Sequence, residues 1–277
     1  MNSAGACRIR EAVSVLECVV NISEGRDPAR IGAIAAAAGD ALLDLHTDPD
    51  HHRSVLTLLG EDGPRHVAEA AVRLLDLTSH SGAHPRIGVV DVVPFVALDA
   101  STSADAEAAR DRFCSWAGTD LGVPCFRYGE MRSLPDIRRS AFAPLVPDCG
   151  PAAPHPTAGA IAVGARPLLV AYNVWLAEPD LARAKRLAVE LRSPSVRALG
   201  LQVGDAVQVS MNLVDPLVTG PGVVVDAIAR QVAVERCELV GLVPRAVLER
   251  EPAGRWGALD LSADRTIEAR ISRSIRR

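Results

Sequence analysis

The chain of 277 residues is long enough for two modest domains or one large one, since domains commonly contain about 150 residues. Hydrophobic residues make up 48% of it and charged residues 23%, a balance that is typical of ordered globular proteins and excludes wholesale disorder. The net charge of −4 argues against a nucleic-acid partner. No apolar run reaches the roughly 18 residues of a membrane span, and no export signal is visible, so we expect a cytoplasmic protein with no membrane partner.

Two further features of the composition narrow the chemistry. Of the 30 basic residues only Lys185 is a lysine, which disfavours a Schiff-base or P-loop lysine and leaves carboxylate and phosphate recognition to arginines. The six cysteines are scattered and show no two-residue spacing. This pattern predicts reduced thiols and neither a disulfide framework nor a zinc knuckle.

The first half of the chain predicts one series of strand, helix, strand, strand, helix, strand. A β-branched run at 13–20 is expected to be a strand, and Asp27 before Pro28 begins a helix that continues to about Ala38. Strands are expected at 41–46 and 54–60, an amphipathic helix at 64–75 and a strand at 87–95.

The second half repeats the series, with elements expected at 168–176, 180–191, 199–203, 206–212, 222–234 and 238–242. Between the halves we expect a helix at 104–122, a short strand at 125–128 and a long Pro/Ala/Gly-rich loop at 141–166. Two β-α-β-β-α-β units predict an α/β (α+β) protein of two ferredoxin-like subdomains with mixed or antiparallel sheets. The domains would be 1–166 and 167–277, with the boundary near Arg166. A single sheet that only looks doubled is the alternative.

The polar loop 45–54 lies between two expected strands and is rich in imidazoles and carboxylates. It contains His46, Asp48, His51, His52 and Arg53. Such a group is compatible with a metal site, but its spacing is not diagnostic, and a solvated hairpin loop explains it equally well.

A second histidine pair joins an expected helix to an expected strand. Gly82 weakens any helix between His80 and His84, and Pro85 favours an extended conformation for His84. We therefore expect the His84 imidazole in a loop facing a cleft, where it could take and return a proton. The alternative is a histidine that only satisfies nearby backbone groups.

Asp91 stands within the apolar run 87–95. A period of two places it on one face of the strand with Ile87, Val89, Val93 and Phe95. A carboxylate in such a row must be paired or take part in chemistry. An ion pair with Arg86 or Arg53 is the structural interpretation.

The stretch 148–160 has too many prolines for a helix and no strand alternation. Backbone groups at Gly150 and Gly159 could contact a flat ligand, and a solvated linker is the alternative. The chain has no G-x-G-x-x-G, P-loop or G-x-S-x-G motif, so nucleotide binding and a nucleophile elbow lack support.

Three motifs, in this order, resemble the formiminotransferase domain of glutamate formimidoyltransferases. They are Glu17-Cys-Val-Val-Asn-Ile-Ser-Glu-Gly25, His84-Pro-Arg-Ile-Gly-Val-Val-Asp-Val-Val-Pro-Phe95 and Gly164-Ala-Arg-Pro-Leu-Leu-Val-Ala-Tyr-Asn-Val174. Weaker matches extend the resemblance over about 16–248. The resemblance implies two α/β subdomains whose sheets face each other across a folate groove.

The resemblance also implies the reaction: transfer of a formimino group from N-formimino-L-glutamate to nitrogen 5 of tetrahydrofolate, as in histidine catabolism and one-carbon metabolism. Tetrahydrofolate would be the co-substrate, no metal would be needed, and the protein would be a homodimer. The family's catalytic histidine corresponds to His84, and Asp91 and His80 are expected to assist it. Substrate binding is expected at Asn21, His46, His52, Arg53 and Arg86, and folate binding at Gly150, Pro151, Pro156, Thr157, Gly159 and Arg166.

Several residues differ from the family pattern. Val20 stands where a proline is usual, His46 and His52 replace an aspartate and an asparagine, and Ala158 replaces an aromatic residue beside an atypical His155. The carboxy-terminal half is also shorter than usual. Another formimino acceptor or donor, or a formyl group, therefore stays open. Two alternatives of other classes are a metal-dependent hydrolase built on the 46–52 loop and a non-catalytic folate-binding protein.

Overall fold

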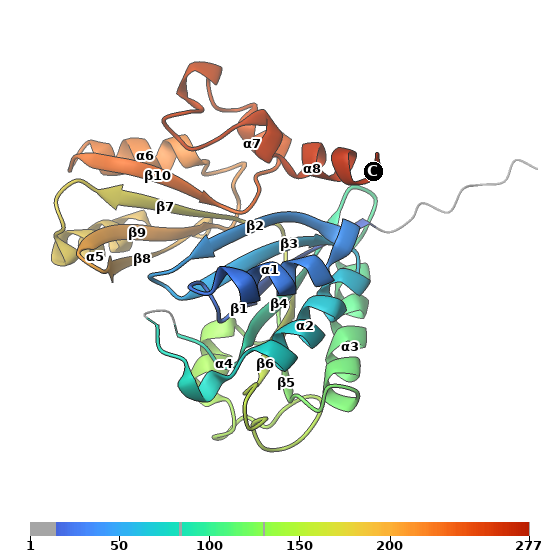
Figure 1. Cartoon of the computed structure of the whole chain (residues 1–277). Helices are drawn as coiled ribbons and strands as arrows, with labels where there is room; N and C mark the ends of the chain where they lie inside the picture. Colours follow the sequence, from blue (N-terminus) through green and yellow to red (C-terminus); the bar gives the residue numbers. More distant parts are fainter. Residues whose placement is uncertain (1–14, 83–84, 130, 277) are drawn as a thin grey trace, which may run out of the picture.

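The computed structural model describes residues 15–82, 85–129 and 131–276. Its strands form a six-stranded and a four-stranded sheet, which lie against each other in the middle of the molecule (Figure 1). Helices cover the outer faces of both sheets (Figure 1). The prediction of two sheets is confirmed, and the single-sheet alternative is wrong.

The first four strands make one ferredoxin-like unit. Its elements are β1 (Val15–Ile22), α1 (Pro28–Ala37), β2 (Leu42–Asp48), β3 (Arg53–Leu59), α2 (Asp62–Leu74) and β4 (Val90–Leu98). The strand order β2-β3-β1-β4 is antiparallel throughout. Asp27 caps α1 by accepting from the N–H groups of Ala29 and Arg30, and Pro28 occupies the first turn, as predicted.

Two further strands extend this sheet beyond β4. The additional elements are α3 (Ser103–Thr119), β5 (Cys125–Tyr128), α4 (Leu134–Ser140) and β6 (Ile161–Ala165), and β4, β6 and β5 run parallel. The prediction of one long loop over 141–166 is therefore wrong at β6. This strand is short and almost completely buried, so its sequence lacks the alternation that identifies a half-exposed strand.

The second unit repeats the first. It contains β7 (Val170–Leu176), α5 (Leu181–Leu191), β8 (Val196–Val203), β9 (Ala206–Leu213), α6 (Pro221–Ala229) and β10 (Val234–Val240). Its antiparallel order β10-β7-β9-β8 matches that of the first unit. The first sheet ends at Ala165 and the second begins at Val170, which supports our proposal of a domain boundary near Arg166.

Helices α1, α2 and α3 cover one face of the first sheet, and α5 and α6 cover one face of the second. The opposite faces turn toward each other, except at β5 and β6, where α4 packs. In the first sheet, Cys18, Val20 and Ile22 pack into the helix-covered core, so alternation places Asn21 on the open face. In the second, Tyr172 and Val174 pack under the helices, so Asn173 faces the first sheet. The polar side chains on these open faces are therefore the candidates for a site between the two sheets.

The end of the chain returns to the first unit. After α7 (Arg245–Leu248), helix α8 (Ile267–Ser274) lies beside β2, where Arg270 pairs with Asp44 at 3.5 Å and the Ser274 hydroxyl donates to the Asp40 carbonyl at 2.6 Å. Leu43 and Ile267 share a small apolar cluster at this contact. Among the described residues no helix has the length and hydropathy needed to cross a membrane.

Candidate active site

Asp91 lies at a β-bulge in β4. Asn21 of β1 pairs with Val92 and Ile22 pairs with Val90, so Asp91 is an extra residue without a partner in the ladder. Val90 and Val93 both lie in the helix-covered core. The expectation that Asp91 shares a face with Val93 is therefore wrong, because the bulge turns the carboxylate to the open face of the sheet.

The buried Asp91 carboxylate is the centre of an arginine cluster. Its Oδ2 accepts from Arg53 Nη1 at 3.0 Å and from Arg138 Nη2 at 2.6 Å, and its Oδ1 accepts from the Ile87 N–H at 2.9 Å. Arg53 Nε also donates to Asn21 Oδ1 at 2.9 Å. The structure thus brings together the predicted Asn21, Arg53 and Asp91, and it adds Arg138 of α4.

A second group of predicted residues lies next to this cluster. The rings of His52 and His80 stack with their centroids 4.0 Å apart. Arg86 Nη1 lies 2.6 Å from His80 ring nitrogens and 3.4 Å from the His52 carbonyl, to which it donates. His52 has a left-handed backbone (φ 51°), and its Nδ1 accepts from the Gly25 N–H at 3.0 Å. This contact fixes the imidazole although it stands in a turn.

Both stacked imidazoles are uncharged at neutral pH. Burial, assisted by the charge of the nearby Arg86, lowers the pKa of His80 to about 4. Burial likewise lowers the pKa of His52, and Arg26 and Arg86 add to this although Glu24 opposes it. A neutral imidazole can accept a hydrogen bond from a guanidinium or an amide, as both rings do here.

His84, the expected proton shuttle, lies outside the described residues. Its described neighbours in the chain are Gly82 and Pro85, which are followed by Arg86 of the cluster. The role of His84 therefore stays a prediction.

His46 lies apart from these groups, on the contact between the two sheets. Its Nε2 is 3.3 Å from Glu238 Oε1 of β10, and Glu238 Oε2 accepts from Asn173 at 3.0 Å and from the Trp175 indole at 2.9 Å. Burial raises the pKa of Glu238, but the hydrogen bonds from these three residues outweigh it and lower the pKa to about 2. Glu238 is therefore an anion throughout the physiological range.

A second contact crosses between the sheets at His51. Its Nδ1 lies 2.5 Å from Asp48 Oδ2, and its Nε2 lies 3.5 Å from the amide nitrogen of Gln208 on β9. Gln208 is completely buried. Polar alternation within β9 (Val-Gln-Val-Ser-Met-Asn) is the sequence signal that could have identified Gln208, because a helix-covered sheet needs only one apolar face.

Glu17 is a buried carboxyl on the open face of β1 that the sequence analysis missed. Only 5% of the residue is exposed. Burial raises the pKa of Glu17 to about 7, although the charge of the nearby Arg166 opposes the shift. Arg166, a predicted folate residue, is therefore placed beside an acid that titrates near neutrality.

This raised pKa predicts how stability depends on pH. Between pH 4.5 and about 7 the folded protein holds a proton on Glu17 that the unfolded chain has released, so the free energy of unfolding should fall as the pH rises through this window. Glu17→Gln should remove about 3 kcal/mol of that decline. Urea unfolding of the wild type and of Glu17→Gln at pH 4.5, 6 and 8 measures this difference. If the free energy of unfolding depended on pH in the same way in both proteins, the raised pKa of Glu17 would be contradicted.

The predicted folate segment divides into two parts. Gly150 (φ 85°) packs against Gly118 of α3, on the helix-covered side of the sheet, and Pro151 beside it is exposed. The Thr157 carbonyl accepts from the Leu77 N–H at 2.8 Å, and a Cβ on Gly159 (φ 72°) would lie 2.3 Å from the Ile87 carbonyl. The end of the segment, with Pro156 exposed beside Thr157, therefore adjoins the residues that hold Asp91.

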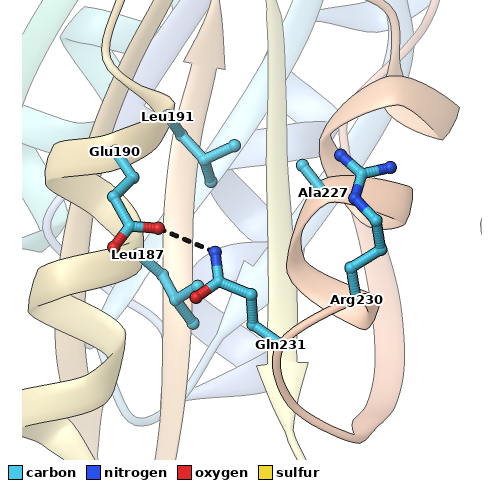
Figure 2. A pocket seen from close by; sticks show the side chains of 6 residues that line it. All are labelled: Leu187, Glu190, Leu191, Ala227, Arg230 and Gln231. Atoms are coloured by element: carbon cyan, nitrogen blue, oxygen red, sulfur yellow. Dashed lines mark hydrogen bonds between the residues drawn. The ribbon is translucent and has the colours of Figure 1, made fainter.

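Two surface pockets of the described residues lie elsewhere. One, of about 220 Å³, lies between α5 and α6 on the outer side of the second sheet, where Gln231 donates to Glu190 at 2.7 Å (Figure 2). The other, of about 430 Å³, lies around Glu61 and Arg112. Neither is lined by a described residue of the predicted site. Within 15–82, 85–129 and 131–276 no group of three or more His, Cys, Asp or Glu side chains is arranged to hold a metal ion.

Known proteins resemble this chain over most of its length. Residues 15–166 match the family model of the formiminotransferase domain, N-terminal subdomain, which ends where the first sheet ends. The chain is 34% identical to the glutamate formimidoyltransferase of Thermoplasma acidophilum over 85% of this chain and 90% of that protein. The identity with the glutamate formimidoyltransferase of Streptococcus pyogenes is also 34%, over 73% of this chain and 78% of the relative.

The chain also matches larger, two-activity relatives. It is 34% identical to the formimidoyltransferase-cyclodeaminase of Sus scrofa over 84% of this chain, and it spans about half (51%) of that protein's length. The family model covers more than half of the chain, and the prediction from the three motifs is confirmed. This protein belongs to the formiminotransferase domain family.

Proposed function

We propose that this protein transfers a formimino group from N-formimino-L-glutamate, or a closely related donor, to nitrogen 5 of tetrahydrofolate. Membership of the formiminotransferase family supports the reaction class. Two relatives that share 34% of their aligned residues with this chain are named glutamate formimidoyltransferases, and this chain covers 78% and 90% of their lengths.

The observation that carries the proposal is the arginine cluster on the open face of the first sheet. The guanidinium groups of Arg53 and Arg138 meet at Asp91, and the Arg86 guanidinium lies beside the stacked His52 and His80. Planar guanidinium groups bind carboxylates with two parallel hydrogen bonds. N-formimino-L-glutamate has two carboxylates and the glutamate tail of folate has others, so these arginines suit both substrates.

Asp91 positions the arginines in this proposal and does not react itself. Its oxygens already accept from Arg53, Arg138 and the Ile87 N–H, which together orient the carboxylate and the two guanidinium groups. The geometry favours this role over direct binding of the cationic amidine, because the carboxylate is 1% exposed.

The transfer itself requires two proton movements. The nitrogen 5 amine of tetrahydrofolate attacks the amidine carbon, and the adduct loses a proton from that nitrogen. The glutamate amine then gains a proton as its bond to carbon breaks. We assign both movements to His84, since one imidazole can accept a proton and return it. Neutral His80 and His52 would orient the substrate and not supply protons at pH 7.

Tetrahydrofolate would bind between the two sheets, near the end of the 150–159 segment. Thr157 and Gly159 adjoin Ile87, which holds Asp91, and Arg166 lies beside Glu17 on the open face. Gly150 and Pro151 are the more distant members of the proposed folate residues. A ligand-bound structure with the pterin outside this region would contradict the placement. We also propose that the protein is a cytoplasmic homodimer. Light scattering measures its oligomeric state.

A spectrophotometric transfer assay tests the function directly. Purified protein with tetrahydrofolate and N-formimino-L-glutamate should form the 5-formimino product, and other formimino or formyl donors should react more slowly. Arg138→Gln should raise the KM for the donor, whereas the matched Arg230→Gln in the remote α5–α6 pocket should leave turnover unchanged. Tetrahydrofolate binding without any turnover would indicate the folate-binding alternative. Activity lost on dialysis against a chelator and restored by metal would indicate the hydrolase.

A further inference from the structure

Three cysteines gather between α3 and β5, on the side of the first sheet away from the proposed site. Cys114 of α3 and Cys125 of β5 are completely buried in the helix-covered core, and the half-buried Cys149 packs against the same core. Cys125 and Cys149 face each other as an antiparallel bridge: the Cys125 N–H donates to the Cys149 carbonyl at 2.9 Å, and the reverse bond is 3.3 Å. The two residues are thus held at a fixed separation.

An arginine completes this thiol cluster. Arg127 Nη2 donates to Cys149 Sγ at 3.6 Å. Asp111 lies 3.3 Å from Arg127 Nε, and the Arg127 N–H donates to Asp148 at 2.7 Å, so both ends of the residue are anchored. A guanidinium beside a thiol stabilises the thiolate, which is the nucleophilic form.

Cys114 is the thiol that interacts with both of the others. Hydrogen bonds from the Cys125 and Cys149 thiols and from Arg127 lower the pKa of Cys114 to about 7 despite its burial. The pKa values of Cys125 and Cys149 are raised, because burial and the neighbouring thiols disfavour a second negative charge. One of the three thiols can therefore be a thiolate near neutral pH. If Cys149 passes its proton to the Cys114 thiolate, the negative charge moves to Cys149, whose sulfur is partly exposed.

We propose that Cys149 and Cys114 form a peroxide-reactive dithiol that closes to a disulfide. The Cys149 thiolate attacks an oxygen of a hydroperoxide, which breaks the O–O bond and leaves a sulfenic acid and an alcohol or water. Cys114 then attacks the Cys149 sulfur and displaces the hydroxyl group, which leaves as water. Two thiols lose two electrons and two protons, and the hydroperoxide accepts them. A dithiol reductant reverses the step.

Cys149 lies where a disulfide would connect a helix to the proposed folate segment. Cys149 precedes Gly150, whose backbone packs on Gly118 of the same helix that carries Cys114. A disulfide between Cys114 and Cys149 would join α3 to the residue that precedes the 150–159 segment, where the backbones of Gly118 and Gly150 already pack together. The proposal does not depend on the proposed transferase function, since it concerns thiols that this function does not use.

Peptide mapping after exposure to hydrogen peroxide tests the pairing. Trypsin releases Cys114 and Cys125 together in peptide 113–127 and Cys149 in peptide 140–183, because it does not cleave before Pro167. We expect a reducible link between these two peptides in the wild type and in Cys125→Ser. It should be absent from Cys114→Ser and Cys149→Ser. Cys237→Ser, which alters a thiol in the second unit, is the matched control and should leave the link intact.

The rate at which hydrogen peroxide oxidises Cys149 distinguishes an activated thiol from an ordinary one. Arg127→Gln should slow loss of the Cys149 thiol about tenfold below pH 7, as expected if the thiol pKa rises by one unit, and Arg127→Lys should restore part of the rate. A link that persists in Cys114→Ser, or a Cys149 that reacts no faster than Cys237, would overturn the proposal. Circular dichroism checks that each variant is folded. Peptide mapping of the wild-type protein tests for the link even if a variant does not fold.

Discussion

Replacing Asp91 with alanine is expected to lower the free energy of unfolding by about 3–5 kcal/mol, the usual cost of leaving buried charge without its partner. Asp91 is 1% exposed and accepts hydrogen bonds from Arg53, Arg138 and the Ile87 N–H. Burial already lowers the pKa of Arg53, and Asp91 is the main charge that opposes this. Without the carboxylate, both guanidinium groups lose a charged partner in a poorly solvated place. Urea unfolding at pH 7 measures the loss.

An exposed pair of the same chemistry provides the control. Asp226 accepts two hydrogen bonds from Arg255, at 2.6 and 3.1 Å, and half of its side chain is exposed. Asp226→Ala should cost no more than about 1 kcal/mol, as is usual for surface ion pairs. The loss of unfolding free energy for Asp91→Asn should lie between those of the two alanine variants, because the asparagine keeps an oxygen that can accept from the Ile87 N–H. Equal losses for Asp91→Ala and Asp226→Ala would refute the central role of Asp91.

Replacing His84 with alanine is expected to lower the turnover number of formimino transfer by about 10²–10⁴-fold, which is the usual contribution of a positioned acid–base group. The affinity for tetrahydrofolate should change little, because the imidazole acts on the adduct. The wild-type pH–rate profile should have a limb near neutrality that the variant lacks. Steady-state kinetics from pH 5 to 9 and direct folate binding measure these effects.

His80→Ala is the comparison that isolates the proton shuttle. His80 titrates at about 4, so its loss should leave the near-neutral limb in place and should affect KM through Arg86 and the His52 stack. If His84→Ala keeps more than about a tenth of wild-type turnover, His84 is not the shuttle. The role would then pass to the histidines of the 45–54 loop.

The sequence predicted the architecture well because both units are built from strongly patterned elements. Helix starts such as Asp27-Pro28 and the alternation of apolar residues depend on neighbouring residues only, and they held in the structure. Boundaries were less accurate: the strand expected to start at residue 87 begins at Val90, and the helix expected to reach residue 234 ends at Ala229. Strand β6 was missed because its burial on both faces removes the alternation.

The site could be predicted only in part, because several of its contacts join residues far apart in the chain. Asn21, Arg53 and Asp91 stood in recognisable motifs, and the structure brings them together. Arg138 reaches Asp91 from α4, and Glu238 reaches His46 from the other sheet. No local pattern specifies such partners, because they follow from how the sheets pack. The arginine and glutamate were visible in the sequence, but their partners were not.

Because of the bulge at Asp91, the site depends on the number of residues in β4. Substitutions, which keep that number constant, do not reveal this dependence. Val90 and Val93 face the core although they are separated by an odd number of positions, and only the extra residue permits this. Deleting one residue at the bulge would restore regular pairing with β1 and keep both valines inside. The same deletion would remove the position from which a carboxylate can face the second sheet. In evolutionary terms, this acidic site could therefore be gained or lost by a single-codon insertion or deletion without repacking the core.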